Sequence, residues 1–382
     1  MGRVTQNGDS YRVTADLVNA SDGAELWGSS YERKSGDITQ VQSDITRDLS
    51  RKLDPQLSAS PGKALGNAGT SNAEAYRLYL EGRQLWHTRD PEGLKRSIDL
   101  FQQSITADPN YALAYAALAD SYNVSPSYGI GISSREGNEK ATSAANKAIA
   151  LDPNLSEGHS ALGYAAASSQ QWPQAEAEFR RAIELNPNNA SAHYFYAVGY
   201  LNPTNQPEQA LKEAQIALSL DPLSAIINTN YSILLMVARK YPQALEHINE
   251  TLSGNPNFIP IYYKRSQIYA AMGRYADAVK DIQTIDELLK TNLVNRKLET
   301  PDANGYAQSI LDTFALSDAD TPAALAVGYA AAGNKDRALQ YLQMAADTHC
   351  DELGFVIRYP VFDSLHSDPR FIDFMHRINL TL

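Results

Sequence analysis

The sequence predicts a mainly α-helical protein in which pairs of helices stack into an α-α superhelix, preceded by a small N-terminal α/β segment. Three observations support this prediction: a proline that recurs at regular spacing, small residues at fixed positions between those prolines, and strand-like alternation near the N-terminus. A unit of only two helices buries too little by itself, so neighbouring units must stack to become stable.

The recurring proline follows an aspartate or an asparagine. Successive prolines of these pairs lie 44, 34, 35 and 34 residues apart. Proline disfavours helical geometry in the residue before it and has no N–H to donate, so each pair predicts the end of a helix. The pairs are Asp108-Pro109, Asp152-Pro153, Asn186-Pro187, Asp221-Pro222 and Asn255-Pro256.

Small residues recur at three positions of each unit, because two antiparallel helices approach closely only where side chains are small. In the middle of the first helix they are Gly82, Ala119, Gly163, Ala197, Ser232, Ser266 and Ala326. Early in the second helix they are Ser97, Ala141, Ala175, Ala210, Ala244, Ala278 and Ala338. Near its end they are Ser104, Ala148, Ala182, Ala217, Thr251 and Ala345, with Ile285 as the exception.

A unit of about 34 residues with this pattern resembles the tetratricopeptide repeat. The resemblance implies about seven helical pairs over residues 73–346, followed by a C-terminal helical cap over residues 347–382. We expect an enlarged turn from His87 to Gly93 in the first pair. The second pair carries an insertion of about ten residues within 125–140, which is either a contact loop or an inert, disordered one.

The N-terminal residues 1–54 alternate apolar and polar side chains in a way that is typical of strands. We expect strands at Arg3–Gln6, Ser10–Asn19 and Ala24–Arg33, joined by tight turns, and then a helix that begins after Asp37. Residues 55–72 are rich in Pro, Gly, Ser and Ala without periodicity, which predicts a linker to the first helical pair.

This region resembles the second half of the TolB amino-terminal-like (FlgO-like) domain of bacterial multidomain signalling proteins. The matching residues are Gly2-Arg3-Val4, Arg12-Val13-Thr14, Leu17-Val18, Asp22-Gly23, Leu26-Trp27, Tyr31-Glu32-Arg33, Val41-Gln42 and Ile45. The resemblance implies a place between an upstream effector, such as a winged-helix domain, an adenylate cyclase or a protein kinase, and a downstream tetratricopeptide array. Because the first βα portion is missing, we expect Met1 to be an internal start, a fragment boundary or a misplaced gene start.

Composition limits the classes of partner. With 43% hydrophobic and 20% charged residues the chain is folded, and its net charge of −11 argues against nucleic-acid binding by this region and favours a neutral or basic partner. Cys350 is the single cysteine, which excludes an internal disulfide. The sequence has no apolar run long enough for a membrane segment, and we expect a cytoplasmic location. It predicts no particular oligomeric state.

The sequence shows no catalytic constellation, so we expect a protein that is not an enzyme and needs no cofactor. His159 and His193 occupy the same register position one repeat apart. With no carboxylate or cysteine in register they indicate packing or groove-lining residues rather than paired metal ligands. The run His349-Cys350-Asp351-Glu352 also carries ligand types, but neighbouring residues of a helix diverge and no second half of a site is visible.

Recognition is the chemistry that remains. The resemblance implies that first helices line a concave groove, where tyrosine and amide side chains suit peptide capture. The alternative is that these residues are ordinary half-exposed surface. The family's carboxylate clamp for chaperone tails does not carry over, since its positions hold Ala116, Asp120 and Ala161. The candidate groove residues are Asp120, Asn123, Tyr164, Ser191, Tyr194, Thr229, Ile233, Tyr263 and Gln267.

We therefore expect a non-catalytic scaffold that binds a protein or peptide in its concave groove, as the sensing or interaction part of a bacterial signalling or transcription-regulatory protein. Two alternatives stay open at this point. One is the regulatory region of an enzyme, an adenylate cyclase or protein kinase, whose catalytic domain lies upstream. The other is an adaptor of the cell envelope, which predicts a secretion signal in the upstream sequence.

Overall fold

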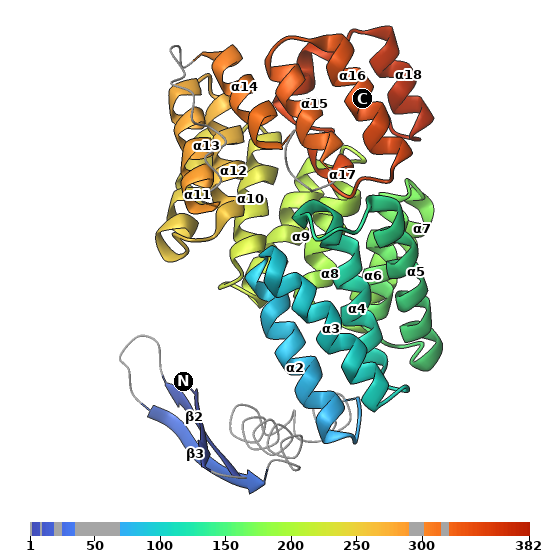
Figure 1. The fold of residues 1–382 in the computed structure, drawn as a ribbon, viewed down its shortest axis with the longest axis vertical. Coiled ribbons are helices and arrows are strands. Elements are labelled where there is room, and N and C mark those ends of the chain that lie inside the picture. The colour runs from blue at the N-terminus through green and yellow to red at the C-terminus, as the bar shows by residue number, and fades with distance from the viewer. Residues whose placement is uncertain (1, 8–9, 19–24, 35–68, 290–301, 315–320) are drawn as a thin grey trace.

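The computed structural model describes residues 2–7, 10–18, 25–34, 69–289, 302–314 and 321–382. Antiparallel helix pairs stack side by side in it, and the stack coils until its last helices lie beside those of the second and third pairs (Figure 1). The prediction of a mainly α-helical superhelix with a small N-terminal strand-containing segment is thus confirmed. No helix of the described residues is long and apolar enough to span a membrane.

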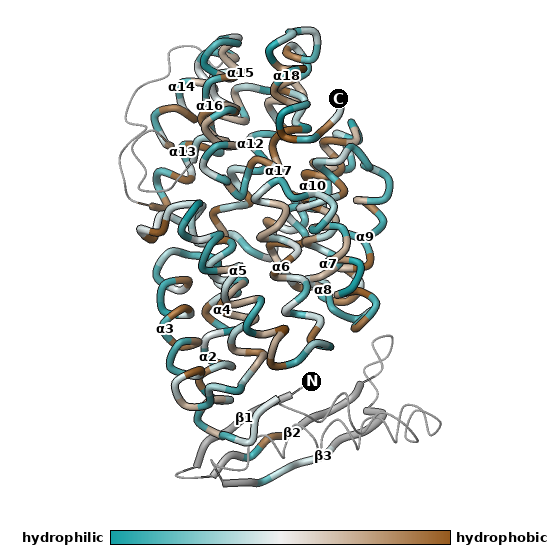
Figure 2. The backbone as a smooth tube through the Cα atoms, turned by 90° about the vertical axis from the view of Figure 1, so that its right-hand side faces the viewer, coloured by the Kyte–Doolittle hydropathy of each residue, from teal (hydrophilic) through white to brown (hydrophobic). Residues whose placement is uncertain are grey.

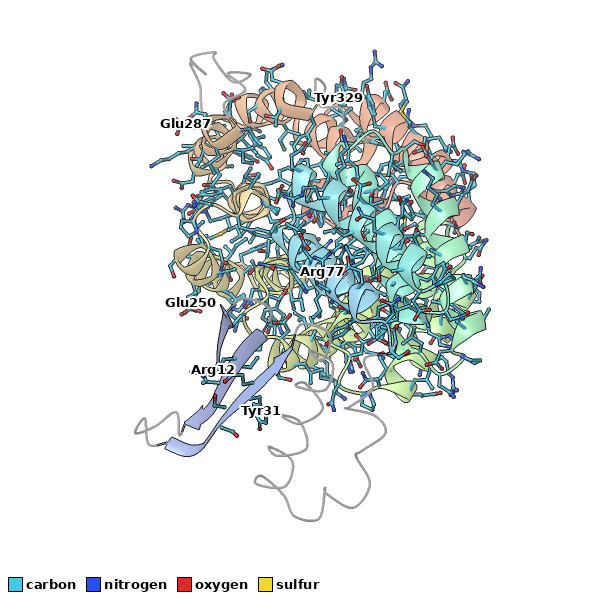
Figure 3. All side chains as sticks on the ribbon, turned by 60° about the horizontal axis from the view of Figure 1, so that its bottom comes forward. Arg12, Tyr31, Arg77, Glu250, Glu287 and Tyr329 are labelled. Atoms are coloured by element: carbon cyan, nitrogen blue, oxygen red, sulfur yellow. The ribbon has the colours of Figure 1, made fainter. Side chains whose placement is uncertain are left out.

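The N-terminal strands form an antiparallel sheet in the order β1 (Gly2–Asn7), β2 (Ser10–Val18) and β3 (Glu25–Lys34). Arg12 on β2 lies opposite Glu32 on β3, and its Nη2 is 2.9 Å from the Glu32 Oε2. Figure 3 shows Arg12 and Tyr31 on these two strands. The helix expected after Asp37, and the linker up to residue 68, lie outside the described residues.

Seven pairs account for most of the helices between residues 73 and 347. The first helices are α2 (Ala73–Thr88), α4 (Ala112–Val124), α6 (Ser156–Ser168), α8 with η5 (Ala190–Phe195 and Tyr196–Leu201), α10 (Ala225–Val237), α12 (Ile259–Ala271) and α15 (Pro322–Ala331). The second helices are α3 (Pro91–Ala107), α5 (Ser134–Leu151), α7 (Trp172–Leu185), α9 (Pro207–Leu220), α11 (Tyr241–Gly254), α13 (Tyr275–Leu289) and α16 (Lys335–Asp347). The remaining elements are η4 (Ser125–Tyr128), α14 (Ala303–Phe314), α17 (Leu353–Val356), η6 (Pro360–Leu365) and α18 (Pro369–Arg377).

The small residues predicted at the helix seams are all buried. At two of these positions the close approach of a neighbouring ring leaves room only for glycine. A Cβ on Gly82 would lie 2.6 Å from the Phe101 Cε1, and one on Gly163 would lie 3.0 Å from the Phe179 Cδ1. The Asp-Pro and Asn-Pro pairs also end helices as expected, because each Asp or Asn is the C-cap residue of a second helix.

Two irregularities differ from their predicted form. The turn expected from His87 to Gly93 is short, because α2 continues to Thr88 and α3 begins at Pro91. Arg89 makes the turn with a φ of 52°, and the Asp90 Oδ1 caps α3 by accepting from the Gly93 N–H. The insertion in the second pair is partly helical, since η4 spans its first four residues and α5 begins within it at Ser134.

The C-terminal residues expected to form a cap are buried at the last pair. Phe362, Leu365, Phe371, Phe374 and Ile378 are each at most 5% exposed, and η6 and α18 contact α15 and α16. The same region reaches further, because α17 contacts α6 and η5 from earlier pairs. Figures 1 and 2 both place α17 inside the coil, between α6 and α12.

Candidate functional site

The residues predicted to line the groove lie on the first helices of five successive pairs, which we call the inner wall. Ser191 is half-buried, and the other eight are each at most 8% exposed. They are therefore covered in this structure rather than open to solvent. The eight are Asp120, Asn123, Tyr164, Tyr194, Thr229, Ile233, Tyr263 and Gln267.

Side-chain contacts join neighbouring helices of the inner wall. The Asn123 Nδ2 donates to the Ala161 carbonyl at 2.9 Å, which links α4 to α6. The rings of Tyr164 and Tyr194 each lie 4.8 Å from the ring of Phe195, centroid to centroid. The Tyr194 hydroxyl accepts from Asn230 of α10 at 3.0 Å. The wall is thus a continuous surface across several pairs.

Part of the inner wall is covered by residues 350–359 of the same chain, which we call the inner segment. It contains the single turn α17 and is held by elements distant in sequence. The Ser127 Oγ of η4 donates to the Asp351 carboxylate at 2.8 Å, across 224 residues of sequence. The Lys264 Nζ of α12 lies 3.3 Å from the Tyr359 hydroxyl.

Several contacts hold the main chain of the inner segment. The Asn202 Nδ2 donates to the carbonyls of Gly354 and Phe355, at 3.0 and 3.2 Å. Just before the segment, the Gln170 Nε2 donates to the Ala346 carbonyl at 2.8 Å. Amide side chains that bond to carbonyls recognise a peptide main chain whatever its side chains are.

Tyr128 of η4 lies near charged groups of both the repeats and the inner segment. Tyr128 is half-buried there, and burial raises its pKa. The charges of Asp351 and Glu352 raise that pKa further, while those of Arg89 and Lys264 lower it. Charges of both signs, from the repeats and from the inner segment, therefore act on Tyr128.

The two cations are unusual because both are buried. Arg89 is 5% exposed, with its guanidinium carbon 3.7 Å from the centre of the Trp86 ring. Lys264 is 7% exposed. Burial by itself lowers the pKa of Lys264, but Tyr359 and Glu352 outweigh it, so the net pKa lies above its ordinary value. Buried cations of this kind require nearby anions or acceptors.

Buried polar atoms of the inner wall, and of the neighbouring end of α2, also lack partners among the described residues. They are the Trp86 Nε1, the Arg89 Nε and the Oδ1 atoms of Asp120, Asn123 and Asn230. The Asp120 Oδ2 is 3.9 Å from the Arg83 Nη1, and burial raises the pKa of the Asp120 carboxyl to about 7. A buried polar atom without a partner costs about 1–3 kcal/mol. The wall thus retains unused capacity for hydrogen bonds.

The repeated histidines lie at the outer seams of the pairs. The His159 Nδ1 is 2.6 Å from the Glu178 Oε2, and its Nε2 is 3.1 Å from the Pro153 carbonyl. His193 repeats this with Glu213 and Pro187, at 2.6 and 3.0 Å. The expectation that they have no carboxylate partner is wrong, because each partner comes from the second helix of the same pair.

Both ring nitrogens of each histidine face an acceptor, so both donate only when the ring is protonated. The pKa of His159 is raised, chiefly by its hydrogen bond to Glu178. Burial lowers the pKa of His193, but the bonds to Glu213 and Pro187 outweigh it and the net shift is upward. Asn228 and Tyr262 hold the equivalent positions and donate to the carbonyls of their own prolines.

The residues of the run His349-Cys350-Asp351-Glu352 do not form a metal site together. Cys350 is 1% exposed, and the Asp351 carboxylate accepts from Ser127. The part of the chain that the structure describes contains no group of three His, Cys, Asp or Glu residues placed to hold a metal ion.

Sequence reasoning missed Arg89, Lys264 and Ser127 as members of this site. Lys264 could have been noticed, since it directly follows a predicted wall residue in a chain of net negative charge. Arg89 could not be assigned because it lies in a turn whose extent was predicted wrongly. Ser127 could not be assigned because it lies in an insertion that has no counterpart in the other repeats. The outer face carries charged side chains such as Glu250 and Glu287 (Figure 3).

Comparisons with known proteins agree with the repeat pattern. A family model described as tetratricopeptide repeat matches residues 156–189, and a second one with the same description matches residues 259–288. These regions contain α6–α7 and α12–α13, two of the pairs described above.

Among curated proteins, a putative adenylate cyclase 3 of Rhizobium meliloti is 27% identical over 118 residues, which cover 31% of this chain and 20% of that protein. The transcriptional regulator HilA of Salmonella typhimurium is 28% identical over 155 residues, which cover 41% of this chain and 28% of that protein. The chain thus spans less than a third of the length of these relatives.

Solved structures offer more distant likenesses. A human IFIT1 dimer is 15% identical, with a TM-score of 0.46, over 81% of this chain and 78% of that one. Yeast Tom70 is 17% identical, with a TM-score of 0.41, over 81% of this chain and 68% of that one. Likeness at this level carries no functional argument. The repeat pattern, the stacked pairs and the two family matches together show that this chain contains tetratricopeptide repeats and folds as a solenoid of that type.

Proposed function

We propose that the chain is a non-catalytic scaffold whose inner wall binds a protein or peptide. The observation that supports this most directly is the way the inner wall already holds a peptide segment. Asn202 bonds to consecutive carbonyls of that segment, while Trp86, Asp120 and Asn123 keep buried polar atoms for which the described residues offer no partner. An incoming peptide would supply donors and acceptors for those atoms.

A comparison of two double variants tests the groove. Tyr164→Ala with Tyr194→Ala removes two rings of the inner wall. Tyr115→Ala with Tyr262→Ala removes two half-buried rings at the outer register of first helices, as a matched control. In a pull-down from the source cells, we expect the first pair to lose bound proteins and the control to keep them. Circular dichroism of both variants shows that they are folded, and equal recovery would overturn the groove proposal.

We further propose that the chain is the sensing or interaction part of a longer bacterial signalling or transcription-regulatory protein, located in the cytoplasm. The relatives named as an adenylate cyclase and a transcriptional regulator support this, because the matched regions are small parts of both. The interpretation of residues 1–54 as half of a TolB amino-terminal-like domain belongs to the same proposal.

The genomic sequence upstream of Met1 tests the second proposal directly. A winged-helix domain in frame would make the chain the receptor part of a regulator, and a cyclase or kinase domain would make it the regulatory region of an enzyme. A secretion signal there, with no effector domain, would contradict the proposal and favour a cell-envelope adaptor.

A further inference from the structure

A cleft of about 540 Å³ lies between α9, α10 and α11, and we call it the outer cleft. On α10 it is lined by Tyr231 and Leu235, whereas Thr229 and Ile233 of the same helix belong to the inner wall. Residues two apart on an α-helix point about 200° apart, so the cleft and the wall lie on opposite sides of α10. Sites for small ligands usually measure about 300–1,000 Å³, so the outer cleft is large enough to hold one.

Negative charges outnumber positive ones along the outer cleft. Glu208 of α9 and Glu246 and Glu250 of α11 line it, together with Lys212 and Lys240. All five residues are exposed, and Figure 3 shows Glu250 on this face. Within the described part of the chain none of the five is in an ion pair. The cleft therefore carries one more negative charge than positive, and its carboxylates are available to a ligand.

The next pair shows how the corresponding place is filled. The helices α10 and α11 begin at residues 225 and 241, and α12 and α13 begin at residues 259 and 275, so the offset is 34 residues. By this offset Arg265 corresponds to Tyr231. The Arg265 guanidinium donates to the Asp281 carboxylate at 2.6 and 2.8 Å and to the Asn249 Oδ1 at 2.8 Å. An arginine thus bridges the second helices α11 and α13.

Aromatic rings complete the environment of this arginine. The guanidinium carbon of Arg265 lies 5.7 Å from the centre of the Tyr262 ring and 5.6 Å from that of the Tyr269 ring. A second cation is tolerated beside it, because Arg274 lies 4.6 Å from the same Tyr269 ring. By the repeat offset Arg274 corresponds to Lys240, so Lys240 does not prevent a guanidinium from occupying the outer cleft.

The outer cleft has counterparts of both groups that hold Arg265. They are Gln215 for Asn249 and His247 for Asp281. Tyr231 contacts both, since its hydroxyl accepts from the Gln215 Nε2 at 2.9 Å and its ring lies 5.1 Å from that of His247. A tyrosine carries no positive charge, however. The cleft therefore keeps the amide, the aromatic ring and the carboxylates of an arginine site without the arginine.

We infer that the outer cleft is a second binding site, which takes the guanidinium group of an arginine side chain from a partner protein. The guanidinium stacks on Tyr231 and donates to Glu246 and Glu250, one helical turn apart on α11. Lys212 stands one turn after Glu208 on α9, where these two can pair with each other. A planar guanidinium matches both carboxylates and an aromatic face, whereas a lysine ammonium does not, so the site favours arginine.

This site is separate from the inner wall. It takes a single side chain on the outside of the repeats, so it is available whichever segment covers the inner wall. The net charge of −11 favours partners with exposed basic residues, and the outer cleft gives such a partner one defined point of attachment.

The test uses the full chain and N-acetyl-arginine amide as the probe, with N-acetyl-lysine amide for comparison. Saturation-transfer NMR follows the probe itself, so one measurement serves every variant. The filled variant carries Gln215→Asn, Tyr231→Arg and His247→Asp, which reproduce the residues of the next pair and supply an internal guanidinium. The uncharged variant carries Glu246→Gln and Glu250→Gln. Circular dichroism shows whether each variant is folded.

The matched control carries Glu92→Gln and Glu287→Gln, the same charge change at two exposed glutamates of α3 and α13. We expect the wild-type chain and the control to bind the arginine amide with the same affinity, and to bind it at least about threefold more tightly than the lysine amide. The filled and uncharged variants should each bind the arginine amide at least about fivefold more weakly.

Equal binding of the arginine amide by the wild-type chain and the filled variant would overturn the inference, because the probe would then be held elsewhere. A control that loses as much affinity as the uncharged variant would overturn it too, since general attraction to an acidic surface would explain the binding. Equal affinity for both amides would contradict the choice of arginine. The pull-down with the Tyr164 and Tyr194 variants tests the other side of the repeats, so the groove proposal can stand while this inference fails.

Discussion

The outer seams at His159 and His193 and the inner wall differ in how their buried polar groups are paired. At the outer seam of the third pair, both ring nitrogens of His159 face an acceptor, Glu178 on one side and the Pro153 carbonyl on the other. On the inner wall, Asp120 and Asn123 each keep a buried oxygen that has no partner within the described part of the chain. Both regions are equally helical and belong to the same repeats.

The difference separates what holds the repeats together from what they can bind. A seam whose polar groups are paired, like those of His159 and His193, contributes to stability and has no polar atom left for a ligand. A wall with unpartnered oxygens and buried cations is costly in free energy, and that cost falls when another segment supplies the missing partners. We therefore expect substitutions at the seams to act on global unfolding, and substitutions at the wall to act on local opening and on pH dependence.

The largest effect is expected at a seam. Phe179 is fully buried against Gly163, so Phe179→Ala should lower the free energy of unfolding by about 3–5 kcal/mol. Urea denaturation followed by circular dichroism measures this loss. The control is Phe355→Ala on the half-buried side of the inner segment, which should cost less than half as much. Equal losses would remove the distinction between seam and wall.

A pH-dependent effect should come next, at the wall. The Asp120 carboxyl keeps its proton in the folded chain up to a pKa of about 7, whereas in the unfolded chain it ionises near its ordinary value of 3.8. The unfolded state therefore binds fewer protons between these values, and stability falls as pH rises through this range.

Between pH 5 and pH 8 the free energy of unfolding of the wild-type chain should fall by about 2–3 kcal/mol more than that of an Asp120→Asn variant. Unfolding curves of both proteins at the two pH values give this difference, in which titrations of other groups cancel. Identical pH dependence in the two proteins would show that Asp120 is ionised in the fold at neutral pH.

The histidine seams should show a smaller effect. A raised pKa means that the folded chain favours the protonated rings, so their contribution is fully present below the unfolded pKa, near 6.5, and is lost as pH rises through the folded pKa. His159→Gln with His193→Gln should cost about 1–2 kcal/mol per site at pH 6 and less at pH 9.

His247 provides a control of opposite sign. Burial lowers the pKa of its imidazole, so the wild-type ring is penalised at low pH instead. His247→Gln should therefore raise the stability of the fold most at pH 5. At the same pH the double variant at His159 and His193 should lower it most. Thermal melting at several pH values compares the two, and a shared sign would contradict the assignment of the outer histidines as protonated.

The seams could be predicted from the sequence because their contacts are local. Gly163 and Phe179 lie 16 residues apart within one unit, and the unit repeats, so each position is supported by several copies. The carboxylate partners of the histidines were also local, at a separation of 19 and 20 residues. They were missed because partners were sought on neighbouring repeats rather than across the pair.

The covering of the inner wall could not be predicted in this way. Ser127 meets Asp351 across 224 residues because the stack coils, and its curvature depends on small rotations between pairs that no periodic pattern encodes. The position of Tyr164 or Gln267 on a first helix could be predicted from register. Whether that side chain is exposed to solvent or covered depends on which distant part of the chain the superhelix brings against it.

The smallest global effect, and the most specific local one, is expected from Ser127→Ala. This substitution removes the hydroxyl that donates to both oxygens of the Asp351 carboxylate but leaves the seams untouched. Global unfolding should change by less than about 1 kcal/mol, because a half-buried hydrogen bond contributes little to a coiled stack held mainly by its seams. Amide hydrogen exchange in residues 351–357 should nevertheless accelerate several-fold, since the inner segment opens separately from the repeats. Ser219→Ala removes an exposed hydroxyl on α9 and serves as the control. If exchange rose equally throughout the repeats, the inner segment would be part of the global fold rather than a separable occupant of the wall.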